Sequence, residues 1–334
     1  MTEPDEYDLL YLHRTVMRPS MGTWARHLLL LGITLCTATL AGLIYPFGPY
    51  QWIEKVDPQT FGDFLRLPLL YLGLIGQAIA NAAGTPGGLL YGFEFSFSLL
   101  FILISHEMGH YVMCRKYHVD ATLPFFIPTP PMIGPAGTFG AFIKILSPMP
   151  SRKAVFDIGV AGPIAGFIAL IPVAMIGLAT LQPAGPVIVD GGITFADPLF
   201  MRIGGAIVGH DPTTSYGNAF YYAAWIGLLV TALNLIPSGQ LDGGHAIYAV
   251  FGERVHKWTG RIAFPVMATM SVIGLIYYGS PSGFIVAIIL GVMMRIRHPQ
   301  PWDMRPLDTK RKVIALLTLL IFALCFVPFP IRIS

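Results

Sequence analysis

Long apolar runs recur from residue 27 to the end of the chain, and they constrain the fold more than any other feature of the sequence. A helix of about 20 apolar residues crosses the hydrocarbon core of a bilayer, and a slightly shorter one suffices inside a bundle. Charged residues make up only 12% of the chain, which is about half of their share in a typical soluble domain. We therefore expect an all-α polytopic membrane protein, and water-soluble folds are excluded.

Seven apolar runs are candidate spans, and two ambiguous runs widen the expected number to between six and eight. The run at 64–84 competes as a further span, but its polar residues Arg66, Gln77 and Asn81 favour an interfacial or re-entrant helix. The run at 281–295 is short and is also compatible with a re-entrant helix. The seven spans are expected at residues 27–48, 89–113, 154–180, 219–237, 262–279, 281–295 and 312–331.

The distribution of basic residues orients these spans. With residues 1–26 in the cytoplasm, 17 of the 21 Lys and Arg residues fall in the inner segments and 4 in the outer ones. This asymmetry is what the positive-inside rule requires, and counting 64–84 as a span would remove it. We therefore predict an uncleaved first span, a cytoplasmic N-terminal segment, and a cytoplasmic position for the end of the helix at 89–113.

Cysteine spacing and net charge exclude several other classes of protein. Cys36, Cys114 and Cys325 lie in or beside apolar runs and have no Cys-x-x-Cys spacing, so neither a disulfide framework nor a thiolate metal site is indicated. The net charge of +3 includes no basic tract with interleaved aromatic residues. We therefore expect no nucleic-acid partner.

The stretch LLFILISHEMGHYVMCRKYH, at 99–118, places several polar groups inside an apolar helix. Polar groups inside a membrane are costly unless something pairs with them. His106 and His110 are four residues apart, so they share one helix face and are close enough to share a metal ion. Glu107 can hold a metal-bound water without being a ligand. The alternative is a pair of histidines that pack within the bundle, with Glu107 bonded to one of them.

A second polar cluster supplies a candidate for a third ligand. A catalytic zinc ion takes three protein ligands and leaves a fourth position open. The stretch WIGLLVTALNLIPSGQLDGGHAIYAVFG, at 225–252, contains Asp242 just beyond an apolar span that is broken by Pro237. Flanking glycines allow that carboxylate to turn inward, and the alternative is that Asp242 is a turn residue before two glycines. Asn234 is either a polar group of the same site or an interhelical hydrogen-bonding residue.

The motif HEMGH in one apolar run, with NLIP and LDG in a later one, resembles the site-2 protease family of intramembrane zinc metalloproteases. The stretches GTFGAFIKI and DIGVAGPIAG lie where that family has its glycine-rich loop and its middle core helix. The resemblance covers about residues 89–255. It implies one Zn²⁺ ion per chain, held by His106, His110 and Asp242.

The resemblance also implies an activity and a substrate class. Glu107 would act as general base on a zinc-activated water that hydrolyses peptide bonds within or near transmembrane helices. The substrates would be single-span or other membrane proteins, delivered through the lipid bilayer for regulated intramembrane proteolysis. A strand-like segment at 138–145, in a small re-entrant loop at 134–146, would pair with an extended substrate. The implied substrate-binding residues are Asn234, Gly137, Thr138, Phe139 and Gly140, with Gly134 also keeping the loop open.

The expected organisation has four parts around a three-helix catalytic core. A cytoplasmic segment at 1–26 precedes a first span and a re-entrant or interfacial segment at 27–88. The metalloprotease core occupies 89–255, with the C-terminal spans at 256–334. No connection is long enough for the PDZ domain of many relatives, and no nucleotide-sensing domains follow the spans, so we expect the form without these modules.

The sequence also bears on the membrane in which the protein resides and on functions other than proteolysis. A prokaryotic plasma membrane is the expected location, and an organelle envelope is the alternative. The sequence does not indicate an oligomeric state. A membrane zinc transporter also needs His and Asp within spans, but its ligands are usually spread along a path or in repeated halves. A catalytically silent scaffold is a further alternative, and the intact Glu107 argues against it.

Overall fold

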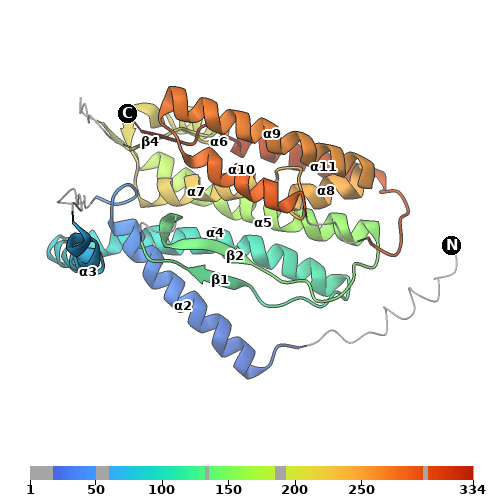
Figure 1. Cartoon of the computed structure of the whole chain (residues 1–334), viewed down its shortest axis with the longest axis horizontal. Coiled ribbons are helices and arrows are strands. Elements are labelled where there is room, and N and C mark those ends of the chain that lie inside the picture. The colour runs from blue at the N-terminus through green and yellow to red at the C-terminus, as the bar shows by residue number, and fades with distance from the viewer. Residues whose placement is uncertain (1–17, 50–59, 132–134, 185–192, 296–299, 334) are drawn as a thin grey trace.

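Most of the helices in the computed structural model run along a common direction (Figure 1). The structure describes residues 18–49, 60–131, 135–184, 193–295 and 300–333. The prediction of a helical polytopic membrane protein is confirmed. The helices are α2 (Met21–Leu43), α3 (Phe61–Gly84), α4 (Gly88–Lys116), α5 (Arg152–Ala179), α6 (Leu199–Val208), α7 (Ala219–Asn234), α8 (Asp242–Phe251), α9 (Glu253–Tyr278), α10 (Ser282–Met293) and α11 (Thr309–Cys325).

Five of the described helices are long and apolar enough to cross a membrane: α2, α3, α4, α5 and α9. The predicted spans at 219–237, 281–295 and 312–331 correspond to the shorter helices α7, α10 and α11. The 12 residues of α10 reach only about 18 Å at 1.5 Å per residue, as the prediction of a short or re-entrant helix allows. The first helix begins six residues before the predicted span, because the Ser20 hydroxyl caps it by accepting the N–H of Thr23.

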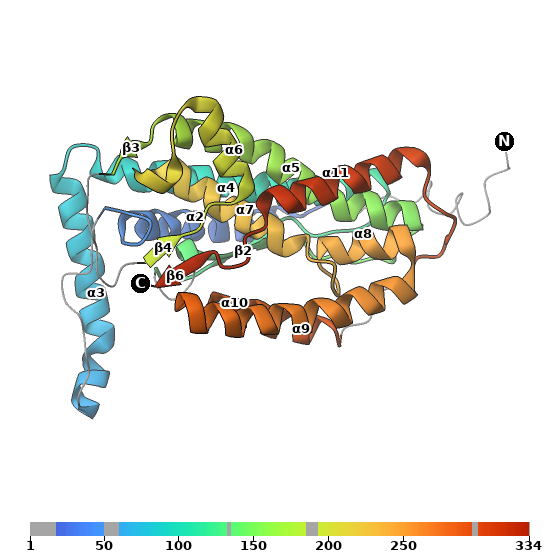
Figure 2. The same ribbon diagram turned by 90° about the horizontal axis from the view of Figure 1, so that it is seen from above.

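The helix α3 runs across one end of the bundle, whereas the other long helices run along it (Figure 2). Only 11% of the most apolar 18-residue stretch of α3 is buried inside the protein, compared with 61% of the corresponding stretch of α5. A capping box between Thr60 and Asp63 starts the helix. Because α3 is long and apolar enough to span a membrane, the interfacial or re-entrant character of 64–84 stays a prediction.

The centre of the molecule is built from α4, α5 and α7. Their buried faces share one apolar cluster that includes Leu99, Leu170 and Trp225. The helices approach closely where glycines remove side chains, since a Cβ on Gly109 would lie 2.4 Å from the carbonyl oxygen of Ala161. The three-helix core is therefore packed tightly enough to fix side chains on α4 relative to α5.

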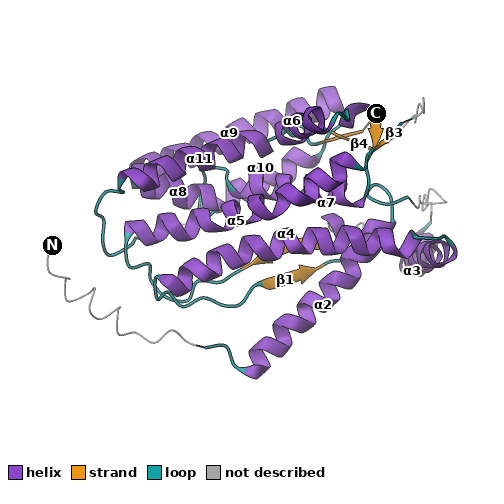
Figure 3. Cartoon of the chain, turned by 180° about the vertical axis from the view of Figure 1, so that it is seen from behind, coloured by secondary structure: helices purple, strands orange, loops and turns teal. Residues whose placement is uncertain are grey.

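A β-hairpin lies between α2 and α4 (Figure 3). Its strands β1 (Phe125–Pro128) and β2 (Thr138–Phe142) pair antiparallel, with Phe125 opposite Phe142. His27 of α2 holds the start of the hairpin through Nδ1, 2.8 Å from the carbonyl oxygen of Pro124. The predicted strand at 138–145 is therefore present, but it ends at residue 142.

The described residues of the connection at 181–218 contain more regular structure than the composition of that connection indicates. It contains α6 and two small antiparallel pairs, formed by β3 with β5 and by β4 with β6. These strands are β3 (Gln182–Pro183), β4 (Ile193–Phe195), β5 (Ser215–Tyr216) and β6 (Ile331–Ile333). The pairing of β4 with β6 joins the connection at 181–218 to the C-terminal end of the chain.

Candidate metal centre

The structure brings His106, His110 and Asp242 together from α4 and α8. Asp242 Oδ2 lies 3.2 Å from Nε2 of His106 and 3.3 Å from Nε2 of His110. The two Nε2 atoms lie 3.2 Å apart. Both histidines are buried, and the Asp242 side chain is 15% exposed. Within the described residues, this is the one group of three or more His, Cys, Asp or Glu residues arranged to hold a metal ion.

The donor atoms and their spacing fit zinc. A tetrahedral zinc ion bound at about 2.0–2.1 Å separates its ligand atoms by roughly 3.4 Å, close to the spacing found between these three side chains. His110 Nδ1 lies 2.7 Å from the carbonyl oxygen of Ile158. A carbonyl can only accept, so Nδ1 carries the proton and Nε2 offers its lone pair to the metal. The group is therefore consistent with a zinc site of two imidazoles, one carboxylate and an open fourth position.

Glycines of α5 leave room for the two imidazoles. A Cβ on Gly162 would lie 2.0 Å from Nε2 of His110, and one on Gly166 would lie 3.1 Å from Nδ1 of His106. The sequence alone favours helix packing as the role of these glycines, and the structure shows that the groups packed against them are the histidines of the site.

Asp242 is positioned by the start of α8. It occupies the first turn of that helix, where an anionic side chain interacts favourably with the helix dipole. The next two residues must be glycines, because a Cβ would lie 2.1 Å from the carbonyl oxygen of Leu235 at Gly243 and 2.4 Å from that of Gly239 at Gly244. The LDGG sequence thus allows the first turn of α8 to pack directly on the preceding turn.

Glu107 lies beside the three ligands without joining them. Its side chain is buried, and the backbone N–H of Ile143, just beyond β2, donates a hydrogen bond to its carboxylate. This contact joins the β-hairpin to the helix that carries both histidines. Sequence reasoning missed both Ile143 and Ile158, because they act through backbone groups that every residue has.

Asn234 ends α7 and lies at the edge of the site. Its Nδ2 is 3.4 Å from Nε2 of His106. The structure therefore places this predicted substrate-binding residue among the metal-binding groups, at the point where α7 gives way to the turn before Asp242.

The other predicted substrate-binding residues divide into two kinds. The Thr138 hydroxyl is used within the hairpin, where it donates to the carbonyl of Ile127 and accepts the N–H of Gly140. Gly137 packs against α2, and a Cβ there would lie 2.3 Å from the carbonyl oxygen of Thr37. In contrast, Phe139 is 63% exposed, and Gly140 has open space around it. Gly134 lies outside the described residues.

Comparison with known proteins identifies the family. A model of "Peptidase family M50" matches residues 94–278, which include all three candidate ligands and Glu107. The "Probable zinc metalloprotease EGY1, chloroplastic" of Arabidopsis thaliana is 28% identical over 315 residues, covering 83% of this chain and 55% of the relative. Its namesake from Oryza sativa subsp. japonica is 27% identical over 267 residues, covering 74% and 44%.

A third relative is also named as a probable zinc metalloprotease. The "Probable zinc metalloprotease EGY2, chloroplastic" of Arabidopsis thaliana is 26% identical over 253 residues, covering 74% of this chain and 42% of the relative. The chain thus spans about half the length of the curated relatives it matches. Their names place them in plant chloroplasts, so the comparisons do not support the prediction of a prokaryotic plasma membrane.

The family model matches more than half of the chain, and it encloses both metal-binding motifs. The long apolar helices make the chain an integral membrane protein. The chain belongs to peptidase family M50, the site-2 protease family.

Proposed function

We propose that this protein is an intramembrane zinc metalloprotease, with residues 89–255 as its proteolytic core. The observation that carries the proposal is the convergence of His106, His110 and Asp242 at spacings of 3.2–3.3 Å, with Glu107 buried next to them. The polar groups meet at one point and include a candidate base, whereas a transporter needs ligands along a path.

His106, His110 and Asp242 would hold one zinc ion. When bound, zinc would lower the pKa of a coordinated water toward about 7 and polarise a peptide carbonyl. Glu107 would accept a proton from the attacking water and deliver it to the leaving amine. The hydrogen bond from Ile143 holds the Glu107 carboxylate in place for both transfers.

One edge of the hairpin is suited to receive an extended substrate. Along an extended chain, successive N–H groups point to opposite sides. Lys144 N donates to Thr122 Oγ1 on the β1 side, whereas Ile143 N points to Glu107. The N–H group of Ala141, which pairs in regular register with Phe126, therefore belongs to the edge that leads to Glu107. A substrate strand added there would satisfy the backbone groups exposed when a transmembrane helix unwinds.

The position of the site along α4 indicates where cleavage occurs. His110 is six residues from the end of α4 at Lys116, or about 9 Å along the helix. The start of α4 at Gly88 lies 18 residues before His106, or about 27 Å away. We place the basic end of α4 and the N-terminal segment on the cytoplasmic side, so membrane-protein substrates would be cut near that face.

A cleavage assay with Glu107→Gln tests the proposal. The full chain is purified in detergent and incubated with a panel of single-span membrane proteins, and its zinc content is measured. Wild type should cleave at least one substrate, and the variant should retain zinc without cleaving because the amide cannot accept the proton. Equal cleavage by both proteins would refute the role of Glu107. Absence of zinc from wild type would refute the proposed function.

A further inference from the structure

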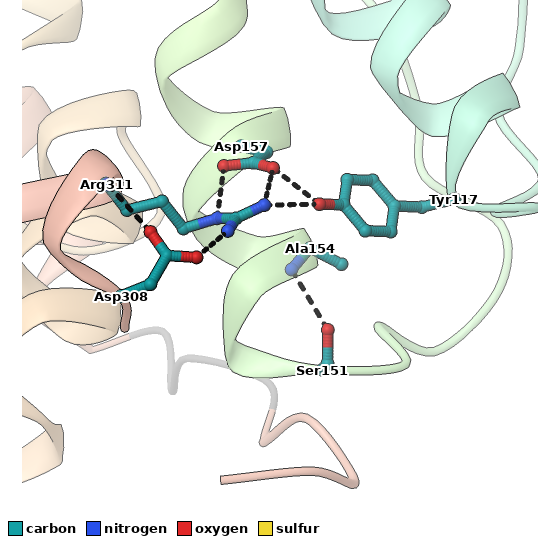
Figure 4. A network of polar contacts seen from close by, with 6 residues as sticks. All are labelled: Tyr117, Ser151, Ala154, Asp157, Asp308 and Arg311. Carbon is teal, nitrogen blue, oxygen red and sulfur yellow. Dashed lines mark hydrogen bonds and ion pairs between the residues drawn. The ribbon is translucent and has the colours of Figure 1, made fainter. Parts of the chain in front are cut away.

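A charged cluster joins α4, α5 and α11 at the end of the bundle that carries Arg115 and Lys116 (Figure 4). Arg311, in the first turn of α11, donates to both oxygens of Asp157, at 2.8 Å through Nε and at 2.6 Å through Nη2. Tyr117, the residue after α4, donates its hydroxyl to Asp157 and accepts from Arg311 at 3.0 Å.

Two properties make this cluster stronger than an ordinary surface ion pair. The Asp157 and Arg311 side chains are only 12% and 20% exposed, and a bidentate Arg–carboxylate pair fixes orientation as well as distance. Burial, reinforced by Asp157, raises the pKa of Tyr117 to about 12, so its hydroxyl keeps the proton that it donates. Asp308 also pairs with Arg311, and it caps the start of α11.

The charged cluster lies next to the backbone carbonyl of Ile158, which orients the imidazole of His110. Asp157 immediately precedes Ile158, whose carbonyl accepts the Nδ1 proton of His110. At Gly109 the backbone of α4 packs directly on Ala161 of α5, and at Gly162 the His110 imidazole packs directly on the backbone of α5. A rotation or slide of α5 would therefore move the Ile158 carbonyl directly, with nothing to absorb the shift.

We infer that Tyr117, Asp157 and Arg311 are positioning residues for the metal centre, acting on His110 through the register of α5 against α4. This inference rests on the proposed function. Arg311 lies beyond the matched residues 94–278, so the centre depends on a helix outside the part of the chain that defines the family. Mutating a group that hydrogen-bonds to a metal ligand commonly lowers metal affinity by 10- to 100-fold.

Titration of the detergent-purified full chain with Co²⁺ tests the inference, because the visible spectrum of Co²⁺ reports the geometry of its ligands. Arg311→Ala should bind Co²⁺ roughly 10-fold more weakly than wild type, with altered absorption bands. Arg311→Lys keeps the charge but not the bidentate geometry, so its affinity should be intermediate. The matched control is Arg305→Ala, which removes the pair between an exposed arginine and the half-buried Asp303 and should leave affinity and spectrum unchanged.

Circular dichroism and gel filtration show whether each variant is folded. If Arg311→Ala does not fold, Tyr117→Phe replaces it, since that variant removes a single hydroxyl and should still weaken Co²⁺ binding in the same direction. A folded Arg311→Ala, or failing that Tyr117→Phe, with the affinity and spectrum of wild type would overturn the inference, even if its melting temperature fell. Failure of wild type itself to bind Co²⁺ would instead refute the proposed function.

Discussion

Gly162 of α5 faces the metal-binding nitrogen of His110 with no room for a side chain. In Gly162→Ala, the new Cβ would lie 2.0 Å from Nε2 of His110, so the imidazole must leave its position in the metal-binding group. We expect loss of zinc and a destabilisation of about 1–3 kcal/mol from overpacking, measured by zinc analysis and thermal unfolding. Gly32→Ala is the matched control, because its Cβ would meet nothing within 4 Å. A variant at 162 with full zinc content would contradict the geometry.

At this scale, the sequence predicts the side chains of the site and misses its backbone groups. His106, His110 and Asp242 stand out because polar residues are rare and costly beside apolar runs. The carbonyl of Ile158 leaves no trace in the sequence, because its role depends on where α5 meets α4. Thr138 was predicted to bind substrate, yet its hydroxyl is engaged by the hairpin itself. A motif alone cannot separate residues that shape a loop from residues that line its open edge.

At the scale of elements, the proposal for substrate binding rests on the edge of β2 that does not pair with β1. Ala141→Pro removes one N–H from that edge, and proline is tolerated in edge strands. The loss of one backbone hydrogen bond should lower kcat/KM by roughly 3- to 10-fold with unchanged zinc content. Ala141→Gly keeps the N–H and should behave like wild type. Full activity of a folded proline variant would show that substrate does not pair at this edge.

Some helices and strands can be recognised from the sequence and others cannot, and the physical reason differs between them. The long helices α4 and α5 follow from apolar length alone, whereas α9 begins at Glu253, nine residues before the predicted span at 262–279, in a polar stretch. The glycine- and proline-rich segment after α4 contains a strand, as expected. The short helix α6 is apolar, but its 10 residues are too few to stand out as a span in the sequence. The ends of α2 depend on the cap at Ser20, which a hydropathy run does not reveal.

At the scale of the whole molecule, the proposed orientation in the membrane rests on the distribution of basic residues. The 28 residues of α5 separate its ends by about 42 Å. Met304 lies near the first end, where Asp303 N donates to the carbonyl of Pro150, and Tyr216 lies near the other, on β5 paired with β3. Both side chains are exposed.

Cysteine labelling tests this orientation. In a Cys36→Ser background, an impermeant maleimide should label Met304→Cys from the cytoplasmic side and Tyr216→Cys from the opposite side. The remaining native cysteines, Cys114 and Cys325, are buried. Labelling of both introduced cysteines from the same side would overturn the proposed topology, and with it the assignment of the cleavage face.

The central claim is that side chains 132 residues apart in the sequence, on α4 and α8, hold one zinc ion. Zinc quantification on the purified full chain, comparing wild type with Asp242→Ala, tests it most directly. We expect one zinc ion per wild-type chain and essentially none in Asp242→Ala, because the carboxylate that bridges both imidazoles is lost. A folded Asp242→Ala protein that retains a full complement of zinc would contradict the claim.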